Sequence, residues 1–115
     1  MSLVHQQLAI VLTELEAEMR RLDLWEANPP SPAALQSTQP FAVDTLKFSQ
    51  WLQFIFVARL RLMIAAGGML PSTCSVRPMA EESFKGMDRN MSALEALIGR
   101  VDELLSGGTP DQTLH

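Results

Sequence analysis

Hydrophobic positions are densest between Thr38 and Pro71, where the pattern predicts one long helix with almost no polar face. This segment holds four of the five Phe residues and one of the two Trp residues. A helix that is apolar nearly all round is normally buried, so we expect it to form the centre of the domain. Its start falls between Asp44 and Ser49, either of which could cap it. Gly67-Gly68 should end it, because glycine adopts a left-handed C-cap without strain.

A first helix is predicted from Leu3 to Leu22, with Ser2 as a candidate N-cap. Its apolar residues recur at steps of three and four and form one stripe, whereas Glu16 and Arg20 lie off that stripe as a favourable i,i+4 ion pair. We therefore expect the charged positions to form a solvated face. The stripe consists of Val4, Leu8, Val11, Leu12, Leu15, Met19 and Leu22.

The connection between these two helices is rich in proline. Asn28 to Pro32 forbids continuation of the first helix, because proline lacks the amide donor and restricts the residue before it. Ser31 and Pro32 read as the N-cap and first position of a short helical turn that ends near Gln36. The following segment, Thr38 to Val43, should be extended or looped, since Pro40 holds the preceding residue out of the α region.

The last helical region is predicted from Met79 to Leu105. Its apolar residues repeat with a mean spacing near 3.5, which is the period of left-handed helix packing. Gly86 could kink this region or split it into two helices, and the pattern does not say whether the stripe packs within one chain or between two. The stripe consists of Phe84, Met87, Met91, Leu94, Ile98, Val101 and Leu105.

Together these elements predict an all-α fold, a compact bundle of about four helices around the central apolar helix. No alternating strand pattern or internal repeat is present. The chain of 115 residues is the usual size of one domain. We assign residues 1–108 to a single helical-bundle domain, and 109–115 to a disordered tail because Gly107-Gly108-Thr109-Pro110 stops the last helix.

Composition changes this picture in two ways. Hydrophobic residues make up 47% of the chain and charged residues only 19%, so a monomer would have difficulty covering its apolar surface. A self-association face, and with it a homodimer, is therefore one expectation. The net charge of -4 disfavours direct nucleic-acid binding, which draws most of its non-specific affinity from Lys and Arg opposite phosphate.

The sequence also indicates the cellular compartment of the protein. The single cysteine, Cys74, cannot form an intramolecular disulfide, which favours a reducing compartment. No Lys or Arg precedes the apolar Leu8 to Leu12, so the amino terminus is not a typical signal peptide. Gln53, Arg59 and Arg61 interrupt the longest apolar stretch, at a cost that disfavours a membrane span. We expect a cytoplasmic protein that does not contact the membrane.

Catalytic constellations are missing from the sequence. The two histidines, His5 and His115, lie near the termini, so a Ser-His or Cys-His nucleophile pair is improbable. No cluster has the ligand set of a metal site, and Gly67-Gly68 follows a helix where a phosphate loop would precede one. Cys74 lacks a nearby histidine and is expected to be a half-buried apolar residue. We predict no enzymatic activity, no catalytic residue, no metal and no cofactor.

Carboxylates near loops and helix starts are the remaining candidates for chemistry, and a structural interpretation is stronger for them. Asp44 is expected to cap the central helix, while Glu81 and Glu82 fall in the first turn after Pro78 and complement the helix dipole. Asp88 is the fourth candidate carboxylate of this kind.

A binding site is the main functional alternative. It would be a small-molecule pocket between the central helix and the loop from Thr38 to Asp44, with Trp51 and Asp44 at its rim. Core packing is nevertheless the preferred role of Trp25 and Trp51, and of Met87 and Met91, for which an adaptable partner-binding face is the alternative. The candidate binding residues are Gln39, Phe41, Asp44, Trp51 and Arg59.

Arg59 is the discordant residue of the central helix. On a helical wheel it lies among Leu52, Ile55, Leu62 and Met63, so it is predicted to be buried. An unpaired buried guanidinium would be very costly, and a partner is therefore expected. Candidate partners are Asp44, Glu82 and, less favourably, Glu18; alternatively, Arg59 forms the floor of a cleft for an anionic ligand.

Three segments together resemble a known family: the sequence TQPFAVDT from Thr38 to Thr45, QWLQ from Gln50 to Gln53, and PMAEE from Pro78 to Glu82. They are similar to the YqcC-like family of small uncharacterised bacterial proteins. The resemblance implies an all-α domain with no assigned activity and no established catalytic residues. Members are often encoded beside a tRNA pseudouridine synthase, which implies a link to tRNA modification through that synthase.

The leading hypothesis is therefore a non-enzymatic cytoplasmic interaction or adaptor protein whose protein partner could be a tRNA pseudouridine synthase. Two alternatives stay open. One is the small-molecule-binding domain with the pocket described above. The other is a structural homodimer through the face from Met87 to Leu105.

Overall fold

The helix α1 spans Leu3–Arg21 in the computed structural model, which describes residues 3–72 and 74–106. Its predicted stripe is buried from Leu8 to Met19. The helix ends in a Schellman motif: Leu24 N donates to Met19 O at 2.8 Å and Asp23 N to Arg20 O at 3.0 Å. Asp23 takes the left-handed position with φ 63, where glycine is the usual residue. The first helix is confirmed, and its proposed cap Ser2 lies outside the described residues.

The central helix runs without a break through three consecutive elements: α3 (Phe48–Trp51), the π-helix η2 (Leu52–Val57) and α4 (Ala58–Ala66). It ends as predicted, with Gly67 as a left-handed C-cap at φ 67. The expected N-caps are wrong, because Lys47 occupies the cap position and its N–H donates to Gln50 Oε1 at 2.9 Å. The spacing of apolar residues did not predict the π-helix.

The connection before this helix contains two short elements. The helix α2 (Pro32–Leu35) has Ser31 as its N-cap, and Ser31 Oγ accepts a hydrogen bond from Ala34 N at 3.2 Å. This confirms the cap predicted from Ser31-Pro32. The 3-10 turn η1 (Pro40–Ala42) follows, with φ 57 at Phe41 and φ 50 at Ala42.

The last helical region is split, which was one of the two outcomes left open at Gly86. The helix α5 spans Arg77–Phe84 and α6 spans Ser92–Leu105, and Gly86 lies between them at φ 85. Leu94, Ile98 and Val101 are completely buried, so the stripe packs within the chain. Since α5 begins at Arg77, Glu81 and Glu82 lie beyond its first turn, which corrects their predicted role.

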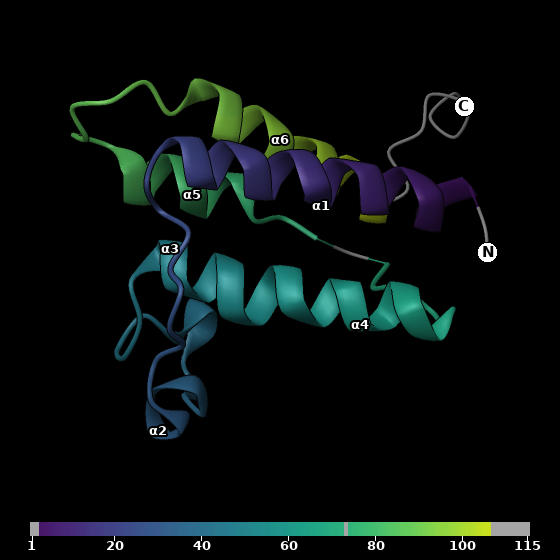
Figure 1. Cartoon of the computed structure of the whole chain (residues 1–115), viewed down its shortest axis with the longest axis horizontal. Coiled ribbons are helices and arrows are strands. Elements are labelled where there is room, and N and C mark those ends of the chain that lie inside the picture. The colour runs from purple at the N-terminus through teal and green to yellow at the C-terminus, as the bar shows by residue number, and fades with distance from the viewer. Residues whose placement is uncertain (1–2, 73, 107–115) are drawn as a thin grey trace.

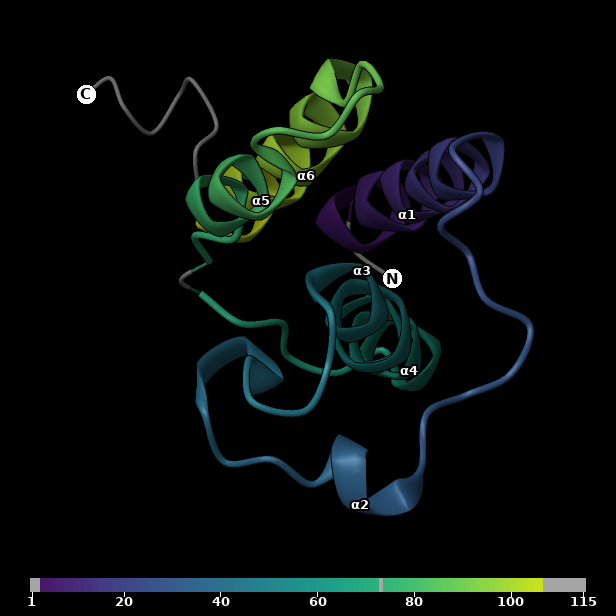
Figure 2. The same cartoon turned by 90° about the vertical axis from the view of Figure 1, so that its left-hand side faces the viewer.

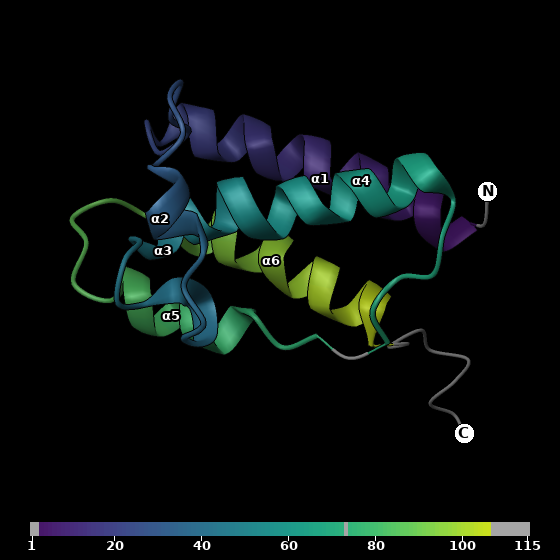
Figure 3. The ribbon, with the colours of Figure 1, turned by 90° about the horizontal axis from the view of Figure 1, so that it is seen from below.

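The main helices form a layered bundle (Figures 1 and 2). α1 and α6 lie side by side and make the most extensive contact, α5 packs on α6, and α4 lies against α1. Viewed from below, α4 crosses in front of α1 and α6, while α2 lies near the α3 end (Figure 3). The fold is the all-α bundle that the pattern predicted, and no strand occurs among the described residues. None of the helices described is both long and apolar enough to cross a membrane.

The central helix is less central than expected. α4 buries Leu60 and Ile64 against the bundle, but Leu62 on its other side is 72% exposed. The prediction of burial all round is wrong because α4 lies at the edge of the bundle and packs through one face only. The expected tail, 109–115, falls outside the described residues.

Candidate functional site: a groove between α1, α3 and α5

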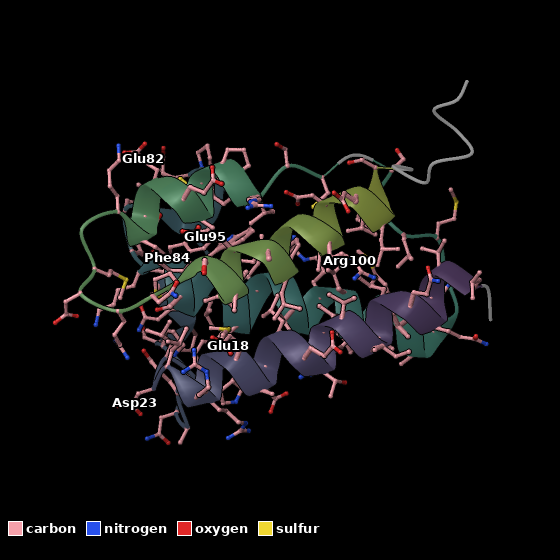
Figure 4. All side chains as sticks on the ribbon, turned by 90° about the horizontal axis from the view of Figure 1, so that it is seen from above. Glu18, Asp23, Glu82, Phe84, Glu95 and Arg100 are labelled. Carbon is pink, nitrogen blue, oxygen red and sulfur yellow. The ribbon has the colours of Figure 1, made fainter. Side chains whose placement is uncertain are left out.

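A groove with a volume of about 500 Å³ lies at the end of the bundle where α1 ends, α3 begins and α5 ends. Asp23 and Phe84 mark this end of the molecule in Figure 4. The groove is lined by both apolar and polar residues, which suits a ligand or peptide with both characters. The apolar lining residues are Leu24, Phe48, Phe84 and Met87, and the polar ones are Asp23, Glu26, Lys47, Ser49 and Ser83.

One wall of this groove is fastened to the central helix by a buried glutamine. Gln53 is only 6% exposed, and its side-chain amide bonds both backbone groups of Glu26. Glu26 N donates to Gln53 Oε1 at 2.8 Å, and Gln53 Nε2 donates to Glu26 O at 2.9 Å. Gln53 lies within the π-helix, a conformation that is rare and often found at functional sites. The segment after α1 is thereby held against the central helix.

Aromatic packing shapes a second wall. The Phe48 ring lies 5.5 Å from that of Phe84 and 5.8 Å from that of Trp51, measured between centroids. Trp51 in turn contacts Phe41 at 4.8 Å and Phe56 at 5.2 Å. Such offset and edge-on pairs add stabilisation beyond their buried area. This cluster joins η1, the central helix and α5 into one unit.

The loop between α5 and α6 is tied to the end of α1, because Arg89 Nη1 donates to Leu22 O. The charges at the groove are mixed: Asp23 and Glu26 are opposed by Lys47. Glu26 Oε1 also accepts a hydrogen bond from Gln50 Nε2 at 3.3 Å. The described residues contain no group of three or more potential metal ligands. The groove thus presents charged, polar and apolar side chains together.

The sequence-predicted site residues lie elsewhere. Phe41 and Trp51 are brought together, as described above, but both belong to the aromatic cluster. Gln39 is exposed and its N–H donates to Ser37 Oγ at 3.1 Å, while Asp44 accepts a hydrogen bond from the same hydroxyl at 2.5 Å. None of the predicted residues lines the groove. The groove residues come from three helix ends, which have no common signal in the sequence.

The burial predicted for Arg59 is wrong. Arg59 is exposed, and its side chain forms no ion pair or hydrogen bond with any other described residue. The π-helix shifts the register that the helical wheel assumed, and α4 lies at the edge of the bundle.

Arg61 is the arginine that joins α4 to α1. Its Nη2 lies 2.8 Å from Glu16 Oε1, and Arg20 Nη2 lies 2.8 Å from Glu16 Oε2. Partial burial raises the pKa of Glu16, but the hydrogen bonds from these two arginines outweigh it and leave that pKa below its usual value. Both guanidinium groups also lie over the Trp25 ring, at 5.4 Å for Arg20 and 5.9 Å for Arg61. The predicted ion pair of Glu16 with Arg20 is thus extended into a network.

Cys74 and His5 have structural surroundings. Cys74 is half-buried, as predicted, and its Sγ lies 3.0 Å from Asp102 Oδ1. Burial and this carboxylate raise the pKa of the thiol to about 12, which keeps it protonated and unreactive at neutral pH. His5 Nε2 lies 2.8 Å from Gly68 O, between the start of α1 and the end of the central helix.

The fold and the groove define a class: small all-α helical bundles without a described metal centre or nucleophile pair. Comparison with known proteins makes this more specific. A family model described as "tRNA pseudouridine synthase C" matches residues 7–104, and the chain belongs to that family. The solution NMR structure of protein YqcC from Escherichia coli has the same fold, with a TM-score of 0.81 and 26% identity. That match covers 94% of this chain and 92% of the other.

Three curated relatives are similar to this chain in sequence. An uncharacterised protein of Haemophilus influenzae is 32% identical over 81% of this chain and 87% of its own length. The uncharacterised protein YqcC of Escherichia coli K12 is 28% identical over 89% of this chain and 94% of its own length. A protein of Pectobacterium carotovorum named tRNA pseudouridine synthase C is 30% identical over 68% of this chain, but the match covers only 21% of that longer protein.

Proposed function

We propose that this protein is a non-catalytic, cytoplasmic accessory subunit of a tRNA pseudouridine synthase, and that it binds the synthase and not the RNA. The observation that carries the proposal is the Pectobacterium relative. A segment similar to this chain occupies about a fifth of a protein named tRNA pseudouridine synthase C. The rest of that protein has ample length for a separate catalytic domain. Where the two parts are separate chains, binding would have to replace the covalent link.

The chemistry of the chain supports an accessory role. Pseudouridine formation requires an enzyme that contacts tRNA, and RNA affinity depends heavily on positive charge opposite phosphate. This chain has a net charge of -4. Its one cysteine is held protonated, and four of the described carboxylates are engaged in ion pairs with Lys or Arg: Glu16, Glu18, Glu81 and Glu82. Catalysis and RNA contact are therefore assigned to the synthase.

Binding and activity measurements test this proposal together. The purified chain should bind the tRNA pseudouridine synthase of the same organism in calorimetry, and should change the rate or substrate range of pseudouridine formation in a tRNA transcript. Alone, it should neither convert uridine nor retain the transcript at physiological salt. Conversion of uridine by this chain alone would show that it is an enzyme, and an absence of binding to the synthase would contradict the accessory role.

The groove favours a second candidate function, small-molecule binding. Its volume of about 500 Å³ falls within the range of known ligand pockets, about 300–1,000 Å³. A thermal-shift screen of metabolites would test this role, with Ser83→Trp as the matched control because a large ring at that position should fill the groove. A compound that stabilises the natural protein and not the variant would support it. Equal shifts in both proteins would place binding elsewhere.

A further inference from the structure

The outward face of α4 is apolar and uncovered. Four positions at helical spacing, Ala58, Leu62, Ala65 and Ala66, are all exposed, and they share one side of the helix because they are four, seven and eight residues from the first. Leu60 and Ile64, on the opposite side, are 2% and 8% exposed. We call the exposed set, together with Arg59, the α4 outer face.

No other described element covers the α4 outer face. In Figure 3, seen from below, the ribbon of α4 lies in front of α1 and α6, and α2 lies near the α3 end of the central helix. Leu62 is 72% exposed, and Met69, just beyond the helix, is 92% exposed. Exposed apolar residues that share one face of a helix are candidates for a protein interaction site.

Arg59 is the only charged residue of this face, and it is free to act outside the chain. The neighbouring Arg61 is engaged by Glu16 and lies over Trp25. The Arg59 side chain has no such contact among the described residues. It follows Ala58 and lies three residues before Leu62, at the edge of the apolar positions. An arginine at the edge of an apolar surface favours a carboxylate on the partner, which it can bind bidentately.

The geometry points to one occupant: we propose that the α4 outer face docks an amphipathic α-helix of the tRNA pseudouridine synthase that carries an Asp or Glu opposite Arg59. The inference rests on the proposed function and names the surface through which it acts. The alanines at 58, 65 and 66 leave room for a second helix to approach at the usual 8–10 Å between axes, with Leu62 as the central apolar contact.

A second copy of this chain is a weaker occupant. Two α4 outer faces packed on each other would place two arginines and no carboxylate in one interface, because no acidic residue belongs to the face. The charge complementarity that selects a partner would be missing. We therefore assign the face to a different protein.

Surface variants test this assignment by calorimetric titration against the synthase. Ala65→Arg should obstruct the close approach of a helix and Arg59→Glu should repel its carboxylate, each weakening binding by about 30-fold or more, as expected at an interface hot spot. Neither should unfold the chain, since both side chains are exposed; circular dichroism verifies this. Ile10→Gln is the matched control, because Ile10 is a 60% exposed apolar residue on α1, and it should bind like the natural protein.

The outcomes separate this inference from the proposed function. If the natural protein binds the synthase and the two α4 variants bind equally well, the α4 assignment is overturned and the accessory role survives. If the natural protein does not bind the synthase at all, both are overturned. Sedimentation is run in parallel: a concentration-dependent dimer that Ala65→Arg abolishes would assign the face to a second copy and overturn the assignment to the synthase.

Discussion

At the residue scale, single polar side chains join segments that are far apart in the sequence. Asp102 on α6 is the clearest case. Its carboxylate accepts hydrogen bonds from the backbone N–H groups of Val76, at 2.9 Å, and Arg77, at 2.8 Å, where α5 begins. It also accepts a hydrogen bond from the Cys74 thiol. Ser106 Oγ accepts a hydrogen bond from Cys74 N and donates one to Cys74 O, both at 2.9 Å. One acidic residue thus caps a helix and holds a thiol protonated.

The reactivity of Cys74 should show this directly. With a thiol pKa raised from 9.0 to about 12, alkylation by iodoacetamide at pH 8 should be roughly a thousandfold slower in the folded protein than in the same protein in urea. Asp102→Asn should lower the pKa of the thiol, since it removes the neighbouring charge, and should speed alkylation. A folded-state rate equal to that in urea would contradict the raised pKa.

The same shift has a consequence for stability. The pKa of the Cys74 thiol is higher in the folded protein than in the unfolded chain. The contribution of this thiol to the free energy of unfolding is therefore fully present below about pH 9. It declines as the pH rises from 9.0 toward 12, because the unfolded chain then loses the proton more readily.

At the scale of elements, the π-helix within the central helix determines which of its side chains face the bundle. The π-helix from Leu52 to Val57 alters which side chains face the bundle, and within it Gln53 is buried and bonds the backbone of Glu26. A regular helical wheel groups Gln53 with Gln50 and Arg61 on one narrow edge. The structure instead uses this glutamine to fasten the segment that forms one wall of the groove.

Gln53→Leu should therefore be destabilising even though it adds an apolar residue to a buried site. The change leaves the N–H and C=O of Glu26 without partners, and we expect a loss of about 2 kcal/mol in the free energy of unfolding. Urea denaturation measures it, and hydrogen exchange at the Glu26 amide should become faster. Gln6→Leu, at an exposed position of α1, is the control and should change little. A Gln53→Leu protein as stable as the natural one would contradict the role assigned to this side chain.

At the scale of the whole molecule, the contact between α6 and α1 holds the bundle together. α6 packs on α1 through Leu94, Ile98, Val101 and Leu105, all at most 5% exposed. Ser106 follows this stripe and bonds Cys74. The core thus needs no residue beyond Ser106 to bury its apolar stripe.

Truncation after Ser106 should accordingly leave stability nearly unchanged. The remaining residues include only one large apolar side chain, Leu114, and predicted tails of this kind are usually tolerant of deletion. Thermal melting of the natural and shortened chains should agree within about 2 °C. A substantially lower melting temperature in the shortened chain would show that the tail contributes to the fold. In that case His115 would have to be considered as part of a site.

The sequence by itself determined the helices, because the signals that define them are local. Apolar spacing predicted α1 and the central helix, Ser31-Pro32 predicted the start of α2, and Gly67 predicted the end of α4. The resemblance in the segments around Thr38 and Gln50 also indicated the correct family. Each of the helix signals depends on residues within a few positions of one another, so no knowledge of packing was needed.

Only the tertiary structure decided how these helices use their faces. Whether α4 is enclosed or lies at an edge depends on which helices surround it, and that arrangement exposed Arg59 and Leu62 against expectation. The groove depends on three helix ends that meet in space, and the π-helix changes the phase on which any helical wheel relies. Partners across a bundle are set by packing between distant segments, for which a single sequence carries no local signal.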